Sequence, residues 1–148
     1  MISVQSADFD VAAEYASLIN NDVDAGAVVL FVGRVRELNL SRHVTGLLLE
    51  HYPGMTEKAL EDILEEARSR WQLLRCRIIH RIGPLTLGDQ IVLVGVTSPH
   101  REQAFAAAEF LMDYLKTRAP FWKKEMTEAG DHWVDAQEKD IASAQRWQ

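Results

Sequence analysis

The chain has 148 residues, of which 47% are hydrophobic and 26% charged, with 22 acidic and 16 basic side chains. Its length corresponds to about one domain, and its hydrophobicity argues against disorder. No apolar run approaches the roughly 20 residues of a membrane-spanning helix, and the N-terminus lacks the features of a secretory signal. The net charge of −6 argues against a general nucleic-acid-binding protein. We therefore expect a soluble, cytoplasmic protein that binds neither nucleic acid nor membrane.

The first half of the chain predicts two helices and two strands. Residues 8–19 carry apolar side chains on one helical face, whereas residues 26–35 are short, apolar and rich in valine, as in a buried strand. A polar, mobile loop is expected over 37–43, followed by a strand over 44–52 that ends at a Pro-Gly turn. Residues 56–71 give the clearest helix, because their apolar positions recur at intervals of three and four. These positions are Leu60, Ile63, Leu64, Ala67 and Trp71.

The second half predicts two more strands, a long helix and a hairpin. Residues 75–82 alternate, which places Cys76, Ile78 and His80 on one face of a strand. A loop is expected from 83 to 89, and an apolar strand over 91–96. Ser98 and Pro99 suit the start of a helix that ends before residue 120. Its expected apolar face contains Ala104, Phe105, Ala108, Leu111, Met112 and Leu115.

The chain ends in a predicted hairpin formed by residues 121–126 and 132–134, and residues 136–148 form a loose helix or a flexible tail. No repeat or linker divides residues 1–148, so we expect a single domain. Strands and helices mix without strict alternation, which favours an α+β fold. The predicted architecture is a mixed or antiparallel sheet covered by two main amphipathic helices, with a small C-terminal hairpin.

Positive charge is concentrated in one short segment of this acidic chain. Between residues 116 and 124 there are four basic residues and no acid, namely Lys116, Arg118, Lys123 and Lys124. Lys116 ends a helix and Lys123 follows the bend at Pro120, so both ammonium groups can converge on one anion. Phe121 and Trp122 can supply apolar walls that lower the pKa of an ammonium group. The alternative is that Lys116 only complements the helix dipole in water.

Two further pairs of basic residues are candidates for an anion site. His100 and Arg101 lie in the first turn of the long helix, where the dipole disfavours cations unless an anion is held there as well. Arg34 and Arg36 lie on one face at the end of a buried strand and can bind phosphate or carboxylate. The residues alone leave a second interpretation open, in which both pairs are simply solvated.

Other residues and motifs point away from redox, metal and nucleotide chemistry. The sequence contains no P-loop, GxGxxG, HExxH, GxSxG or CxxC motif, so we expect neither a cofactor nor a metal site. His80 alternates with isoleucines and is expected to be a core histidine. The single cysteine, Cys76, shares that face and is expected to behave as a small hydrophobic residue rather than as a nucleophile.

Several stretches, taken together, resemble the large, catalytic subunit of molybdopterin synthase. They are FVGRVR at 31–36, LEHYPGMTEKA at 49–59, HRIG at 80–83, SPHR at 98–101 and MDYLKTRAPFWK at 112–123. The resemblance implies a sulfurtransferase of molybdenum cofactor biosynthesis that converts cyclic pyranopterin monophosphate into molybdopterin by forming a dithiolene. It also implies that the sulfur arrives as a thiocarboxylate on the C-terminal Gly-Gly of a small ubiquitin-like subunit. Two large subunits would form the central dimer of a heterotetramer.

The resemblance also assigns site residues by position. Lys116 and Lys123 match the essential catalytic lysines. The residues that match the substrate-binding positions are Arg36, His100 and Arg101 at the anion site and Phe31 and Met112 at the pocket walls. The loop after Arg36 and residue Lys124 differ from some relatives.

The basic residues and the resemblance agree on one physical requirement. A cyclic phosphate and a thiocarboxylate are both anionic, so a site that joins them needs cations to relieve their repulsion. Two alternative functions fit the same residues. One is a non-catalytic module that binds a partner's extended tail, and the other is a phosphate-ester hydrolase.

Overall fold

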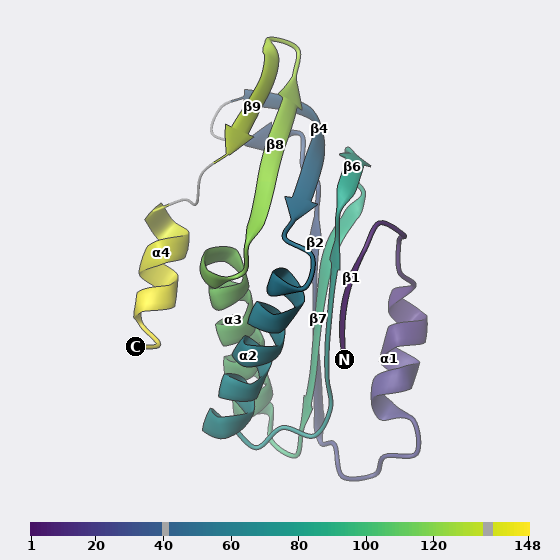
Figure 1. Cartoon of the computed structure of the whole chain (residues 1–148). Coiled ribbons are helices and arrows are strands. Elements are labelled where there is room, and N and C mark those ends of the chain that lie inside the picture. The colour runs from purple at the N-terminus through teal and green to yellow at the C-terminus, as the bar shows by residue number, and fades with distance from the viewer. Residues whose placement is uncertain (40–41, 135–137) are drawn as a thin grey trace.

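The computed structural model describes residues 1–39, 42–134 and 138–148. Figure 1 shows the arrangement of its helices and strands. In chain order, the elements are β1 (Ile2–Gln5), α1 (Val11–Ile19), β2 (Ala27–Arg34), β3 (Leu38–Asn39), β4 (Arg42–His51), α2 (Met55–Arg70), β5 (Cys76–Arg81), β6 (Gly83–Thr86), β7 (Gln90–Ser98), α3 (Arg101–Arg118), β8 (Phe121–Thr127), β9 (Gly130–Val134) and α4 (Glu138–Gln145). The predicted α+β class is confirmed.

The first sheet is mixed, as predicted, and has the strand order β1-β5-β7-β2. Strand β1 runs parallel to β5, whereas β5–β7 and β7–β2 are antiparallel. Helices α2 and α3 cover one face of this sheet and α1 lies on the other (Figure 1).

The sequence did not predict β1, because a four-residue segment that includes Ser3 and Gln5 carries too little apolar periodicity. Its register is fixed by long-range pairing, which begins with Ile2 opposite Ile78.

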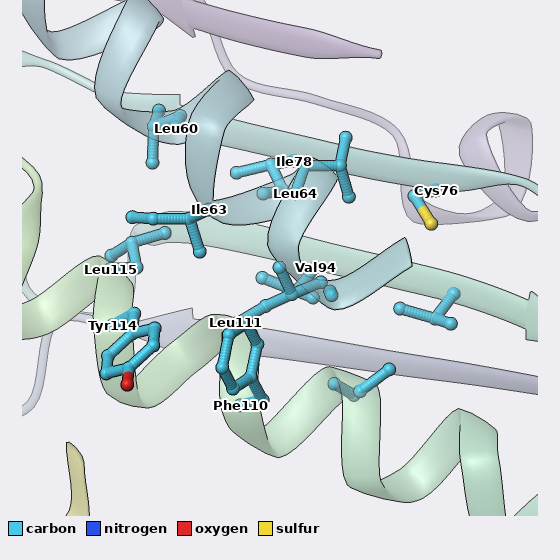
Figure 2. Close-up of a cluster of buried hydrophobic side chains, with 14 of the residues drawn as sticks. Leu60, Ile63, Leu64, Cys76, Ile78, Val94, Phe110, Leu111, Tyr114 and Leu115 are labelled. Carbon is cyan, nitrogen blue, oxygen red and sulfur yellow. The ribbon is translucent and has the colours of Figure 1, made fainter. Parts of the chain in front are cut away.

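The main core lies between this sheet and helices α2 and α3 (Figure 2). The predicted apolar face of α2 is confirmed, since Leu60, Ile63, Leu64 and Ala67 are all buried. The predicted alternation of β5 is confirmed as well. Cys76 and Ile78 belong to this core, whereas Ile79 packs in a smaller cluster on the α1 side.

Helix α3 differs from its prediction at two points. It begins at Arg101 rather than at Ser98–Pro99, because Ser98 is the last residue of β7 and its hydroxyl donates to the Gln72 carbonyl. Phe105, expected in the core, is 62% exposed. The helix packs against α2 and α4 as well as the sheet, so its buried surface is shifted toward Ala107, Phe110 and Tyr114.

The second sheet has β4 at its centre, paired with β8 on one side and β6 on the other. The predicted hairpin of β8 and β9 is confirmed. Residues 83–86 were expected in a loop but form β6, an edge strand, where Pro84 is tolerated because edge strands leave N–H positions unpaired. The expected loop over 37–43 contains β3, which pairs with the start of β4, while residues 40–41 lie outside the described residues.

The C-terminal segment forms helix α4 from residue 138, and the start of the predicted tail at 136–137 lies outside the described residues. Past this helix, the Trp147 ring packs edge-on against Trp71 and Phe110, with centroid distances of 5.5 and 5.6 Å. The Trp147 indole N–H also donates to the Asp113 carboxylate at 2.7 Å. These contacts hold the chain end against α3, which brings α4 close to the end of that helix.

Candidate functional site

A cavity of about 540 Å³ lies where the two sheets meet the C-terminal end of α3. Its wall is built from β2, β4, β5, β7, α3, β8, β9 and α4, so residues far apart in the sequence face one space. Five of the seven predicted site residues line it. They are Phe31, Arg36, Met112, Lys116 and Lys123.

The two lysines reach the cavity from different elements, as predicted. Lys116 lies in the last turn of α3, and the chain bends at Pro120 before β8 begins. Alternation along β8 then directs Phe121 and Lys123 into the cavity. Trp122 is on the opposite face and 47% exposed, so the expectation that it walls the lysine site is wrong.

The electrostatic environment lowers the pKa of Lys123. Burial of its ammonium is the largest cause, and the positive charge of Lys116 lowers the pKa further. The carboxylates of Glu125 and Asp140 act in the opposite direction, whereas Arg36 adds to the lowering. A partly buried lysine beside other cations releases its proton more readily than a fully exposed lysine does, which suits proton transfer as well as anion binding.

Helix α4 contributes two charged residues that the sequence did not predict. Lys139 and Asp140 line the cavity, and an Asp140 carboxylate oxygen lies 4.0 Å from the Lys116 Nζ. The segment is polar and short, so its sequence gave no signal that it packs over a site. It is held there by long-range contacts, which include the burial of Ala144 in the main core and the contacts of Arg146 and Trp147 with Asp113 on α3.

Glu125 is a second residue that the sequence did not single out. It is 1% exposed and lines the cavity two positions after Lys123 on the same face of β8. The available signal was the alternation of the strand, which places this acid on the face of Lys123. A buried carboxylate near the ammonium favours the charged form of the lysine.

The strand-end arginines also belong to the cavity wall. Arg34 and Arg36 both line it, and the Arg34 Nε donates to the Gly88 carbonyl at 3.2 Å. The pairing of β2 with β7 shifts between Gly33 and Arg34, which marks a bulge at this end of the strand. Positive charge thus enters the cavity from β2 as well as from α3 and β8.

His100 and Arg101 do not line this cavity. They lie at the start of α3, and Lys116 lies near its end, about 24 Å away at 1.5 Å of rise per residue. Arg101 has an 81% exposed side chain, 3.9 Å from the Glu102 carboxylate. Within one chain, these two residues and the lysines therefore do not contact the same small molecule.

His80 is buried, as predicted, but it also lines the cavity. Its ring stacks on Phe121 with a centroid distance of 3.8 Å and an interplanar angle of 18°. Burial lowers its pKa from 6.5 to about 4, with a smaller contribution from nearby His51. The imidazole is therefore neutral at physiological pH.

The lowered pKa of His80 predicts an acid-sensitive component of stability. The unfolded chain takes up a proton near pH 6.5 and the folded chain only near pH 4, so stability falls as the pH decreases through this interval. Between pH 7.5 and 5 the loss from this group should be about 2 kcal/mol. Urea unfolding at both pH values should show that His80→Phe removes this component. His132→Asn, at an exposed position, provides the control, since the component that belongs to His80 should remain in this variant.

Cys76 is 3% exposed, and burial raises the pKa of its thiol. A thiol in this environment stays protonated and is a poor nucleophile. It belongs to the apolar core, as predicted.

None of the helices in the described part of the chain is long and apolar enough to cross a membrane.

These features define an α+β protein with a cationic cavity suited to a ligand that carries more than one negative group. A family model described as MoaE protein matches residues 4–118. The molybdopterin synthase catalytic subunit of Vibrio cholerae is 60% identical over 147 residues, which cover 99% of this chain and 97% of that protein. The chain therefore belongs to the MoaE protein family.

Solved structures agree with this assignment. The molybdopterin biosynthesis MoaE protein of Burkholderia ambifaria superposes with a TM-score of 0.84 at 51% identity, covering 99% of this chain and 97% of that one. A Helicobacter pylori structure, described as a complex of subunits 1 and 2 of molybdopterin-converting factor, has a TM-score of 0.75. It is 19% identical and covers 92% of this chain and 91% of that one, so it shows the shared fold.

Proposed function

We propose that this chain is the catalytic subunit of a molybdopterin synthase. It converts cyclic pyranopterin monophosphate into molybdopterin, using sulfur from the C-terminal thiocarboxylate of a small ubiquitin-like subunit. The observation that carries this proposal is the convergence of Lys116, Lys123 and Arg36 on one cavity from three different segments. Family membership and the 60% identity to a named catalytic subunit support the same reaction.

The cationic cavity matches the electrostatic demand of this reaction. The donor thiocarboxylate and the cyclic phosphate repel each other when they approach, and ammonium and guanidinium groups offset that repulsion. They also stabilise negative charge that develops as the sulfur attacks and the phosphate oxygen leaves. In this proposal Lys116 donates a hydrogen bond to the thiocarboxylate oxygen, and Lys123, whose pKa is lowered, transfers a proton. Phe31 and Met112 form apolar walls for the pterin.

The proposed sulfur donor is a separate protein. The H. pylori structure is described as a complex of two subunits of molybdopterin-converting factor, which supports an assembly with a small partner. The buried thiol of Cys76 supports the same conclusion, because a core cysteine is a poor sulfur carrier. We further propose that this chemistry takes place in the cytoplasm, as expected from the sequence.

We propose that His100 and Arg101 act on the cavity of a second copy of the chain. The distance of about 24 Å along α3 prevents them from reaching their own chain's lysines. A twofold dimer can place the start of one helix α3 near the cavity of the other copy, and the same contact then occurs twice. This arrangement makes the predicted central dimer part of the active site.

Genetic complementation tests the proposed function. Expression of this chain in bacteria that lack their own catalytic subunit should restore the activity of a molybdenum-dependent enzyme. Lys116→Ala should fail to restore it while accumulating to the same level. Failure of the unaltered chain, expressed as a folded protein together with a matching small subunit, would contradict the proposal.

A further inference from the structure

His80 is a buried polar side chain in the cavity wall to which no role has been given above. It is 6% exposed, and the Phe121 ring lies against one face of its imidazole at 3.8 Å. Phe121 and Lys123 are two residues apart on the same face of β8, so about 6–7 Å separates their backbone positions. The imidazole therefore lies in the cavity wall beside the proposed reaction centre, with an aromatic ring as its neighbour.

One hydrogen bond fixes the tautomer of His80. Its Nδ1 lies 2.8 Å from the Arg81 carbonyl oxygen, and a carbonyl oxygen only accepts hydrogen bonds. Nδ1 must therefore carry the proton and donate it to this contact. In the neutral ring, Nε2 is then an acceptor with a free lone pair.

Within the described residues, Nε2 has no hydrogen-bond partner. Among the described residues, the fully buried side-chain oxygen or nitrogen without a partner is Glu57 Oε1, so Nε2 is not sealed inside the protein. An acceptor that is accessible in a cavity wall can take a hydrogen bond from a ligand that displaces water. One ring face is covered by Phe121 and Nδ1 is occupied, which leaves Nε2 as the polar atom that a ligand can reach.

We propose that His80 is a substrate-binding residue whose Nε2 accepts a hydrogen bond from an N–H group of the substrate's pterin ring. This inference rests on the proposed function and adds the orientation in which the pterin substrate binds in the cavity. The anionic groups of the ligands lie toward Arg36, Lys116 and Lys123. The heterocycle lies toward His80 and Phe121, where a neutral acceptor suits a neutral N–H donor.

The charge of each neighbouring group supports this division of the cavity. The carboxylates of Glu125 and Asp140 already interact with Lys123, so they are not the natural acceptors for a neutral ring. His51, on β4, is the titratable group that acts on His80 electrostatically. Because burial keeps His80 neutral above about pH 4, its acceptor function should not change across physiological pH.

Three variants separate hydrogen bonding from packing. His80→Phe keeps a buried ring against Phe121 but removes the acceptor. His80→Gln can place its Oε1 near the position of Nε2, and His80→Asn is too short to do so. Loss of one neutral hydrogen bond to a buried donor should raise the KM for the pterin substrate about 10-fold in the Phe and Asn variants. The Gln variant should stay within about 3-fold of the unaltered protein, and the KM for the thiocarboxylated carrier should not change.

Direct binding of a phosphate-free pterin, followed by its fluorescence, gives a readout that does not require turnover. The unaltered protein should bind this probe about 10-fold more tightly than the Phe and Asn variants. Equal binding by all four proteins, at equal thermal stability, would overturn the role of His80 while leaving the proposed function intact. A raised KM for the carrier alone would also overturn it. Absence of dithiolene formation by the unaltered protein would instead count against the proposed function.

Discussion

Lys123→Ala should lower the rate of dithiolene formation by at least about 100-fold, the effect expected when a preorganised charge is removed from a reaction centre. The ammonium lies in the cavity with Lys116 and Arg36, and its burial lowers its pKa. Alanine removes both the positive charge and the transferable proton. The rate should be measured in single turnover with saturating thiocarboxylated carrier, so that weaker partner binding does not mimic a catalytic defect.

Lys124→Ala is the matched control for this experiment. Lys124 is the next residue on β8 and faces away from the cavity, with its Nζ 5.0 Å from the centre of the Trp133 ring. Its removal should change the rate by less than about 3-fold, as expected for an exposed cation–π contact. Similar losses in both variants would contradict a specific role for Lys123.

Lys123→Arg distinguishes the two proposed roles of the ammonium. Arginine keeps the positive charge but does not release a proton at neutral pH. If Lys123 transfers a proton, this variant should be nearly as slow as the alanine variant. Substantial activity would instead assign Lys123 to charge stabilisation alone.

Arg101→Ala should inactivate the enzyme as strongly as Lys116→Ala, by roughly 100-fold, although the two residues are about 22 Å apart in one chain. The reason is that, in the proposed dimer, each active site takes its lysines from one copy and Arg101 from the other. Co-expression of the two variants at equal levels should then recover about a quarter of the unaltered activity. Random pairing makes half of the dimers mixed. In each mixed dimer, one of the two sites has both its lysines and Arg101 intact, so a quarter of all sites are active.

Co-expression of Lys116→Ala with Lys123→Ala provides the control for this recovery. Both lysines line the cavity of the same copy, so every site in a mixed dimer lacks one of them. No recovery is expected. Different affinity tags on the two chains allow the mixed dimer to be isolated and assayed. An inactive mixed dimer of the Arg101 and Lys116 variants would contradict a site shared between copies.

The features that could be predicted from sequence are those encoded by local patterns. The apolar spacing of Leu60, Ile63 and Leu64 identified α2 and its buried face. Alternation in β5 and the bend at Pro120 were sufficient to place His80 in the core and to bring Lys116 and Lys123 together. In each case, the period of the secondary structure determines which side chains share a face.

The features that were missed depend on contacts between distant segments. Strand β1 has little pattern of its own and forms because it pairs with β5. Asp140 reaches the cavity because residues beyond α4, such as Trp147, pack against α3. The position of His100 and Arg101 relative to the cavity depends on the length of α3, and their proposed role depends on a second copy of the chain.

Reconstitution of sulfur transfer from purified components tests the central claim most directly. The chain, a thiocarboxylated small subunit and cyclic pyranopterin monophosphate should together yield a dithiolene, and omission of the carrier should abolish the product. If the carrier binds tightly but no sulfur reaches the pterin, the chain is a binding module. Release of inorganic phosphate from simple phosphate esters without a carrier would identify a hydrolase. Either result would contradict the assignment of the lysine-lined cavity to sulfur transfer.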